Sequence, residues 1–443
     1  MNTPLVFVIV INWNGRQHLE ACFASLLDAA WENAVYLLVD NASTDGSVAF
    51  VEERFGPDPR VRVLALSENR GWSGGNNAGI EAALMAGADY IFLLNNDTAT
   101  APEAIPVLVE RMEGNPALGA LAPRMLMFDQ PEILNSTGLR LSIVGAAWDI
   151  GIGRFDGPRW RADGPVAGVC GGAMFLRAAA VRDAGLLPED FEIYLDDLDL
   201  CLRIWNAGWR IEQCAGAVVR HKYSATMGAG RQARRKYYLN TRNRFRIVLR
   251  HFPARALLLA LACIAVGEAR AMGRAAQSGA LWRIPAHLRA WGAALAYWPI
   301  ARRFRKSRVG TGAAAFWPLV ARRPWFCPEL MLPRDGWYPP VVWRGAVVRP
   351  IAPRAEVEVP AGALQVLLVN CYPAAGEARV RLLQGDALIG ELAASDAAEG
   401  RFAVEAGALT IIAVSTFLLE DTGATADAGA WLRLACNGVE LPR

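Results

Sequence analysis

The segment Asn95-Asn96-Asp97 follows an apolar run, Tyr90–Leu94, that has the length and composition of a buried strand. Side chains alternate along an extended backbone, so Asn95 and Asp97 project to the same side. Magnesium and manganese ions prefer oxygen ligands and usually bind through one or two carboxylates together with substrate phosphates. The segment therefore predicts a divalent cation site that a phosphate-bearing substrate completes.

A second group of candidates is the acidic sequence Asp196-Asp197-Leu198-Asp199. Apolar residues at positions 195, 198, 202 and 205 predict a helix that begins there. Adjacent carboxylates repel each other, and such pairs are typical of sites that use the charge. One of these carboxylates is therefore a candidate general base. Acidic residues also favour a helix N-terminus for electrostatic reasons alone, and this second explanation stays open.

His221 is the third candidate, because it closes an apolar strand-like stretch, Ala215–Val219. A neutral imidazole at a strand end near acidic residues is a plausible metal ligand. A surface histidine without a role is the simpler alternative for any single histidine.

These candidates lie in a regular alternation of apolar and amphipathic segments. Strands are expected at Leu5–Ile11, Val35–Val39, Val61–Leu66 and Tyr90–Leu94, and helices at His18–Leu27, Gly46–Phe55, Gly74–Ala86 and Pro102–Met112. The alternation predicts an α/β domain with a mostly parallel sheet, in which ligands bind beyond the carboxyl ends of the strands. Polar residues follow all four strands there: Asn12, Asp40, Asn69, and the pair Asn95 and Asp97.

Five ordered motifs then carry a resemblance to a known family. They are Val8–Gly15 (VIVINWNG), Val39–Ser47 (VDNASTDGS), Glu68–Gly79 (ENRGWSGGNNAG), Leu94–Thr98 (LNNDT), and the acidic sequence at 196–199 followed by His221. In this order they resemble the family 2 glycosyltransferases with the GT-A fold, and most of all the bacterial rhamnosyltransferase-like branch. The resemblance covers residues 5–250.

The resemblance implies a nucleotide-sugar donor, with a dTDP- or UDP-linked sugar. Asp40 would contact a pyrimidine base. Further residues assigned to the nucleotide are Asn12, Asn69 and Asn76. Apart from the resemblance, Arg234, Arg235 and Arg242 lie at the start of a basic block and are expected to reach the diphosphate. Asn95, Asp97 and His221 would hold Mg²⁺ or Mn²⁺. An Asn stands where the family usually has the first Asp of a D-x-D motif, which removes one charge and weakens the predicted metal site.

The resemblance also implies a catalytic role for Asp197, as the base that takes the proton of the acceptor hydroxyl. The acceptor side is assigned to Trp72, Gly172 and Asp196. A single displacement at the anomeric carbon inverts that centre, while a metal neutralises the departing diphosphate. The expected product is a cell-surface polysaccharide built on a glycan or lipid-linked acceptor, with L-rhamnose as one candidate sugar.

The charge of the chain is unevenly distributed. Residues 231–310 contain 18 Lys and Arg but one acidic residue, Glu268, whereas residues 346–443 contain 7 basic and 12 acidic residues. Aromatic residues among apolar helical runs favour an anionic membrane surface over nucleic acid as the partner of the basic block. A helical subdomain with a solvated face is the alternative. No apolar run is expected to reach the roughly 20 residues that span a bilayer.

Three domains are expected: a GT-A catalytic domain (1–250), a basic amphipathic helical segment at the membrane surface (251–340), and a β-sandwich-like accessory domain (341–443). For the last, carbohydrate binding, self-association as a homo-oligomer and packing on the catalytic domain all stay open. The sequence starts almost directly with a strand and lacks signal-peptide features. We therefore expect a cytoplasmic protein, peripheral at the inner face of the plasma membrane.

Two other functions are weighed against glycosyl transfer. A nucleotidyltransferase acting on sugar phosphates would share the α/β architecture, but it calls for a Gly-rich, basic loop after the first strand, where this chain has Asn12-Trp13-Asn14-Gly15. A non-catalytic sugar-binding scaffold would not require Asp97, Asp197 and His221 together.

Overall fold

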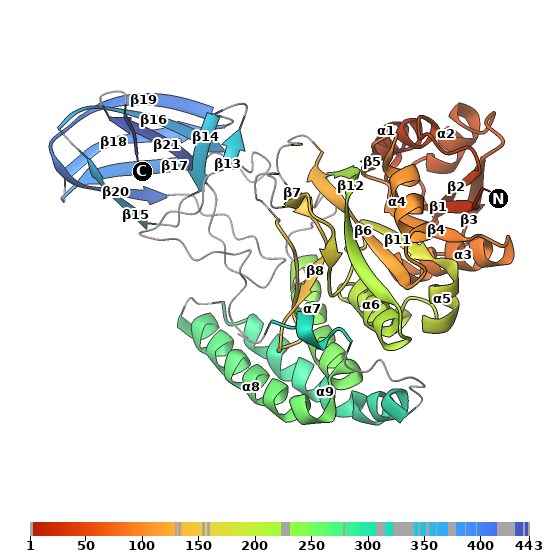
Figure 1. Ribbon diagram of the computed structural model, residues 1–443. Coiled ribbons are helices and arrows are strands. Elements are labelled where there is room, and N and C mark those ends of the chain that lie inside the picture. The colour runs from red at the N-terminus through yellow and green to blue at the C-terminus, as the bar shows by residue number, and fades with distance from the viewer. Residues whose placement is uncertain are drawn as a thin grey trace. The chain divides into compact units, whose positions relative to one another are not determined.

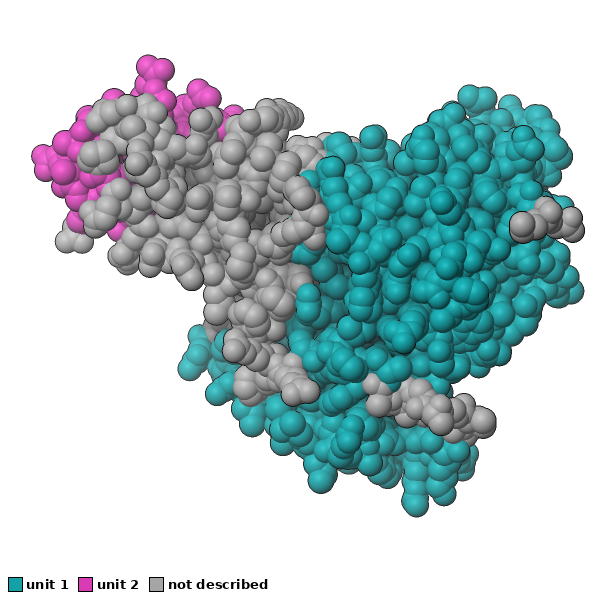
Figure 2. Space-filling model, in the orientation of Figure 1, with its two compact units in different colours: residues 1–325 teal, residues 326–443 magenta. Residues whose placement is uncertain are grey.

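The computed structural model describes most of the chain in two compact units, residues 1–325 and residues 326–443 (Figure 2). The described residues are 3–128, 131, 134–152, 156, 160–222, 231–277, 280–306, 315–321, 341–343, 346–350, 354–359, 361–370, 378–385, 387–395, 397–413, 430–436 and 439–441. The three-domain division expected from the sequence stays a prediction.

The first unit is built around a ten-stranded sheet with the order β10-β12-β6-β11-β4-β1-β2-β3 (Figure 1). Its central strands are β1 (Val6–Asn12), β2 (Ala34–Asp40), β3 (Val61–Ala65), β4 (Tyr90–Asn95), β6 (Leu118–Met127), β11 (Ala173–Arg177) and β12 (Arg210–His221). Strands β10 (Gly164–Pro165), β5 (Thr98–Thr100) and β7 (Leu134–Ser136) extend it. Neighbouring pairs are parallel except at β11, which runs antiparallel to β4 and β6, and at the three short strands. The prediction of a mostly parallel sheet is confirmed.

Six helices connect these strands, and a short hairpin follows β7. The helices are α1 (Arg16–Leu27), α2 (Ser47–Arg54), α3 (Gly71–Met85), α4 (Ala104–Glu113), α5 (Ala178–Ala184) and α6 (Asp196–Asn206). The hairpin pairs β8 (Leu139–Leu141) with β9 (Ala147–Asp149). Most boundaries lie within two residues of the expected ones, because β1, β2 and β4 are apolar runs that end at a polar residue. Helix α3 begins three residues earlier than expected, at Gly71.

The strands are apolar on both faces because helices cover both faces. Along β1, the side chains of Phe7, Ile9 and Ile11 join one core, and those of Val6, Val8 and Val10 join the other. Helix α3 packs closely on the first core through two glycines. A Cβ atom at Gly75 would lie 2.3 Å from Ile11 Cδ1, and one at Gly79 would lie 2.6 Å from Ile9 Cγ2. The Gly-rich motif therefore brings α3 against the carboxyl ends of β1 and β2.

Three long helices complete the first unit: α7 (Arg231–His251), α8 (Ala254–Gln277) and α9 (Arg283–Lys306) (Figure 1). In the part of the chain that is described, α8 is long and apolar enough to cross a membrane, judged by length and composition alone. The uncharged run of this helix, residues 256–267, is shorter than the roughly 20 residues of a bilayer span, and the helix reaches its full length by continuing through Glu268 and Arg270.

The second unit contains two antiparallel sheets. One has the order β13-β14-β21-β16-β19, with β22 paired to β21, and the other has the order β15-β20-β17-β18 (Figure 1). Their strands are β13 (Val341–Trp343), β14 (Ala346–Pro350), β15 (Arg354–Val359), β16 (Gly362–Asn370), β17 (Ala378–Gln384), β18 (Ala387–Ala394), β19 (Ala397–Val404), β20 (Gly407–Ala413), β21 (Ala430–Cys436) and β22 (Val439–Leu441). One core draws on both sheets, for example through Leu364 and Leu368 on β16 and through Leu409 and Ile411 on β20. This arrangement confirms the expected sandwich-like fold.

Candidate active site

The carboxyl ends of β1 and β2 place Asn12 beside Asp40, because the parallel register pairs these two residues directly. Asn12 donates from Nδ2 to Asp40 Oδ1 over 2.9 Å, and both side chains are buried. The second oxygen of Asp40 accepts the backbone N–H of Ser43. Asn96 donates to Asn12 Oδ1 over 2.6 Å, which joins the end of β4 to this pair. The first, second and fourth predicted strands therefore deliver polar groups to one edge.

Trp72, near the start of α3, lies between the β4 end and the loop before β11. Its indole Nε1 donates to Asn95 Oδ1 over 3.0 Å. A Cβ atom added to Gly171 would lie 2.8 Å from Trp72 Cζ2, so the ring packs directly on that glycine. The amide oxygen of Asn95, which was expected to face a metal, thus accepts a hydrogen bond from Trp72.

Asp97 and His221 meet because β12 ends antiparallel to β5, with His221 paired to Thr98. His221 Nε2 lies 3.2 Å from Asp97 Oδ1, and both side chains are buried. Burial opposes the charge on Asp97, but the hydrogen bond and the charge of His221 outweigh it, so the pKa of Asp97 is lowered. The other ring nitrogen of His221 lies 3.0 Å from Asn135 Oδ1.

The three carboxylates in the first turn of α6 have different surroundings. Asp196 accepts a 2.6 Å hydrogen bond from Ser73 Oγ. Asp197 accepts the backbone N–H groups of Gly171, at 2.9 Å, and Leu198. Burial, and then the charge of Asp196, raises the pKa of Asp197 to about 7. Asp199 is buried against Arg203, Arg250 and His251, whose charges overcome the cost of its burial and lower its pKa. Of these three, Asp197 combines partial exposure with a pKa suited to proton transfer at neutral pH.

These contacts form one continuous site. Gly171 bonds to Asp197 and packs on Trp72, and Trp72 bonds to Asn95. A Cβ atom at Gly172 would lie 3.2 Å from His221 Cε1, so the next residue touches the Asp97–His221 pair. The structure therefore gathers the expected metal, base and acceptor residues around two adjacent glycines.

Other residues assigned from the sequence lie at the margin of this network. Asn69 is exposed and accepts the backbone N–H of Gly71 at the start of α3. Asn76 is buried and donates to the backbone oxygen of Trp72. Arg234 stacks over the ring of Trp282. Arg242 is buried against Glu192 and the backbone oxygens of residues 190 and 191. Both arginines belong to α7, and their roles toward a nucleotide stay predictions.

Two polar residues of the site carry no sequence signal that would have revealed them. Asn135, from β7, lies behind His221. Asp149, from β9, is close enough to Asp197 to raise the pKa of that carboxyl, and its own pKa is raised by burial. The Oδ1 atom of Asp149 is buried without a hydrogen-bond partner among the described residues. Both arrive from the hairpin region after β6, where the regular alternation of strands and helices has ended.

The site residues fall largely within a segment that matches a known family model. Residues 7–182 match the model of glycosyl transferase family 2. This segment is a family 2 glycosyltransferase domain. The resemblance seen in the sequence motifs is thereby confirmed, and the later residues Asp197 and His221 lie beyond the matched segment.

Similarity to individual glycosyltransferases extends past the matched segment. The chain is 27% identical over 246 residues to an N-acetylglucosaminyl-diphospho-decaprenol L-rhamnosyltransferase of Mycobacterium tuberculosis, covering 51% of this chain and 78% of that relative. It is 28% identical over 239 residues to an N-acetylglucosaminyltransferase of Sinorhizobium fredii, covering 51% of this chain and 54% of the relative. Among solved structures, it overlaps a mannosyltransferase of Pyrobaculum calidifontis in complex with GDP-Man and Mn²⁺, with a TM-score of 0.45, 19% identity, and coverage of 71% of this chain and 87% of the other.

Proposed function

We propose that this glycosyltransferase is an inverting, divalent-cation-dependent enzyme that moves a sugar from a dTDP- or UDP-linked donor to a lipid-linked or glycan acceptor. The observation that carries the proposal is the placement of Asp197 and the Asp97–His221 pair on adjacent glycines, 171 and 172. Asp197 suits proton removal, and the Asp97–His221 pair suits a cation beside a diphosphate. A nucleotide-binding scaffold would need only the second.

The Asp97–His221 pair has the chemistry of a cation site. When His221 donates its Nδ1 hydrogen to Asn135, an unprotonated Nε2 faces the Asp97 carboxylate, and two electron-pair donors lie 3.2 Å apart. The described residues contain no group of three or more His, Cys, Asp or Glu side chains that could hold a metal. Substrate phosphates and waters are the usual further ligands of Mg²⁺, and we assign them that place. A bound Mg²⁺ or Mn²⁺ would supply the positive charge that stabilises the departing diphosphate.

The side chains of the chain divide the remaining work. Asp40 and Asn12 bind the nucleoside end of the donor at the β1–β2 edge. Asp197 accepts the proton of the acceptor hydroxyl as that oxygen attacks the anomeric carbon, and the two backbone N–H groups fix the carboxylate in place. Trp72 presents its ring on the acceptor side, where an aromatic face suits a sugar ring.

The proposed identities of the sugar and the acceptor are based on the names of two relatives. The Mycobacterium tuberculosis relative is named for L-rhamnosyl transfer to a diphospho-decaprenol-linked sugar, which favours rhamnose and a lipid diphosphate acceptor. The Sinorhizobium fredii relative is named for N-acetylglucosaminyl transfer, so a second donor belongs in any test. The direct experiment measures nucleoside diphosphate release from dTDP-rhamnose and UDP-N-acetylglucosamine, with and without Mn²⁺, for the wild type and Asp197→Asn. Release from neither donor class, or full release by the variant, would contradict the proposal.

A lipid acceptor requires access to a membrane surface, and α8 and α9 offer a face for it. Large apolar side chains are exposed along both helices and the turn between them: Leu258, Leu259, Val266, Leu281, Leu288, Leu295, Trp298 and Ile300. Leu288 and Leu295 are seven residues apart on α9, which places them on one face. Exposed basic residues accompany them, among them Arg255, Arg270, Arg289 and Arg302. We propose that this apolar and basic face rests on the anionic inner surface of the plasma membrane, with the catalytic site on the cytoplasmic side.

Vesicle flotation tests whether this face binds an anionic membrane surface. The wild type should float with phosphatidylglycerol vesicles and much less with phosphatidylcholine vesicles, and a double variant Leu258→Glu, Leu295→Glu should remain at the bottom. Met85 on α3 is also exposed and lies on another element, so Met85→Glu is the matched control and should float like the wild type. Flotation of the double variant with wild-type efficiency would exclude this face.

A further inference from the structure

The segment that leads into Asp196 and Asp197 has an unusual backbone. Three of its residues that are not glycine, Glu192, Tyr194 and Leu195, have positive φ angles of 66°, 69° and 64°. Side chains other than glycine rarely adopt this left-handed region, and they do so where the surrounding structure compensates for the strain. Leu195 is the N-cap of α6, so this segment decides where the helix begins and where its first-turn carboxylates lie.

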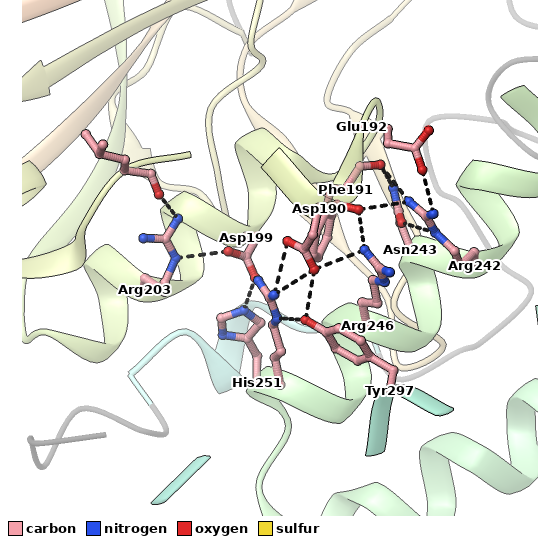
Figure 3. Close-up of polar contacts among 12 residues, drawn as sticks. Asp190, Phe191, Glu192, Asp199, Arg203, Arg242, Asn243, Arg246, His251 and Tyr297 are labelled. Carbon is pink, nitrogen blue, oxygen red and sulfur yellow. Dashed lines mark hydrogen bonds and ion pairs between the residues drawn. The ribbon is translucent and has the colours of Figure 1, made fainter. Parts of the chain in front are cut away.

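Helix α7 supplies the compensation through one buried amide. Asn243 has no exposed surface, and its Nδ2 group lies 2.9 Å from the backbone oxygen of Phe191 (Figure 3). The same group lies 2.9 Å from the backbone oxygens of Ile193 and Tyr194. Two hydrogens are thus shared among three carbonyl oxygens of a segment that lies outside any long helix or strand. The neighbouring Arg242 donates to Asn243 Oδ1, which orients the amide.

Arginines of the same helix bind the preceding residues. Arg242 donates to the backbone oxygens of Asp190 and Phe191, and to the Glu192 carboxylate (Figure 3). Arg246 and Arg250 form ion pairs with Asp190, and Arg250 also pairs with the buried Asp199 on α6. Helix α7 therefore contacts the strained segment before the carboxylates and the helix after them.

We infer that Asn243 is a positioning residue for the catalytic carboxylate, acting through the backbone of residues 191–195. The inference rests on the proposed role of Asp197 as the base. Three carbonyl oxygens held by one side chain fix the left-handed residues, and these fix the first turn of α6. Asp197 then keeps its hydrogen bond to the Gly171 N–H at the acceptor side. Without this support, the first turn of α6 would fray and the carboxylate would change position. Among the described residues, the hydrogen bonds of the Asn243 side chain go to this segment and to Arg242, and not to the sheet edge proposed for the nucleotide.

The test compares two variants at this position with a control on the same helix. Asn243→Ala removes the amide, and Asn243→Asp keeps its shape but puts acceptor oxygens against three carbonyls. Thr241→Val is the control, because Thr241 is also buried on α7 and bonds within the helix, to the Tyr237 oxygen. The measurements are kcat and KM for donor hydrolysis and transfer, calorimetric affinity for the nucleoside diphosphate, and hydrogen exchange of residues 189–198.

Both variants at position 243 should lose about 100-fold in kcat, which is the cost of displacing a reacting group by about 1 Å. Their nucleotide affinity should match the wild type, exchange of residues 189–198 should be faster, and Thr241→Val should behave like the wild type. A folded Asn243→Asp with wild-type kcat and exchange would overturn the inference. If neither variant folds, Arg242→Lys replaces them. This change removes the guanidinium that donates to the backbone oxygens of Asp190 and Phe191. A loss confined to nucleotide affinity in that variant would also overturn it.

The failure of the proposed function gives a different pattern. A wild-type protein that releases no nucleoside diphosphate from any donor contradicts glycosyl transfer. Hydrogen exchange of residues 189–198 still decides whether Asn243 holds this segment, because that measurement needs no substrate.

Discussion

Nε2 of His221 lies 3.2 Å from Oδ1 of Asp97, while Nδ1 of the same ring lies 3.0 Å from Oδ1 of Asn135. The ring therefore has an acceptor on each side, although a neutral imidazole carries one hydrogen. Asp97 and His221 would hold the proposed cation, which would supply the positive charge missing between Nε2 and the carboxylate. Its further ligands would come from a diphosphate.

Asp97→Asn should therefore remove the cation dependence of donor binding. The amide keeps the size of the side chain but loses the negative charge, so the affinity for a nucleoside diphosphate in Mn²⁺ should fall by about 10- to 100-fold. Affinity measured with a chelator present should change little. Calorimetric titration with and without Mn²⁺ makes the comparison, with Asp58→Asn, a partly exposed carboxylate paired to Arg60, as the control. Equal Mn²⁺ dependence in Asp97→Asn and the wild type would rule out this site.

The pH dependence of catalysis should report Asp197. A base works only when it is ionised, and its pKa is raised to about 7 by burial and by the charge of Asp196. The value of kcat should therefore fall as the pH drops below about 7, whereas an ordinary aspartate, with a pKa of about 3.9, would remain active well below that. Asp196→Asn removes the second cause and should move the acidic limb to lower pH. If the fall of kcat at low pH occurs at the same pH in Asp196→Asn as in the wild type, the titrating group is not Asp197.

The elements around the site could be predicted because their signals are local. An apolar run buried on both faces, such as Val6–Asn12, needs no knowledge of its partners, and the polar residue at its end falls on the ligand-binding edge whatever the strand order. The pairing of Asn12 with Asp40 follows from the parallel register alone. The start of α6 at the acidic sequence was predicted for the same reason, since apolar spacing and acidic first-turn residues point to one place.

The contacts made by distant segments could not be predicted in this way. Asn135 and Asp149 come from short strands without regular spacing. Only the pairing of β7 with β6 and the β8–β9 hairpin bring them to His221 and Asp197. The basic block, residues 231–310, could be predicted only in part. The sequence gives its charge but does not indicate which acidic residues its arginines contact. Arg242 and Arg250 face Glu192 and Asp190 inside the unit, so part of the positive charge counted from the sequence is neutralised internally.

Glu268 illustrates how that neutralisation supports the helical region. It is the one acidic residue of residues 231–310 and is buried between His287 and Arg244. Glu268→Gln keeps the shape but weakens both interactions, and it should lower the free energy of unfolding by about 1–3 kcal/mol. Urea denaturation measures the loss, and Glu52→Gln, an exposed change on α2, should be neutral. An equally neutral Glu268→Gln would mean that the buried pairs contribute no net stability.

The hydrogen bond between Trp72 and Asn95 separates two roles for the first residue of the N-x-D motif. If the Asn95 amide orients Trp72, Asn95→Ala frees the indole, and KM for the acceptor should rise about five- to tenfold, equivalent to roughly 1 kcal/mol. The Mn²⁺ concentration for half-maximal activity should then stay constant. Asn95→Asp keeps an oxygen for the indole and should retain the acceptor KM. Asn115→Ala, in the turn before β6, serves as the control. A raised Mn²⁺ requirement with unchanged acceptor KM would instead make Asn95 a metal ligand, because only a ligand to the cation changes its affinity without disturbing the acceptor side.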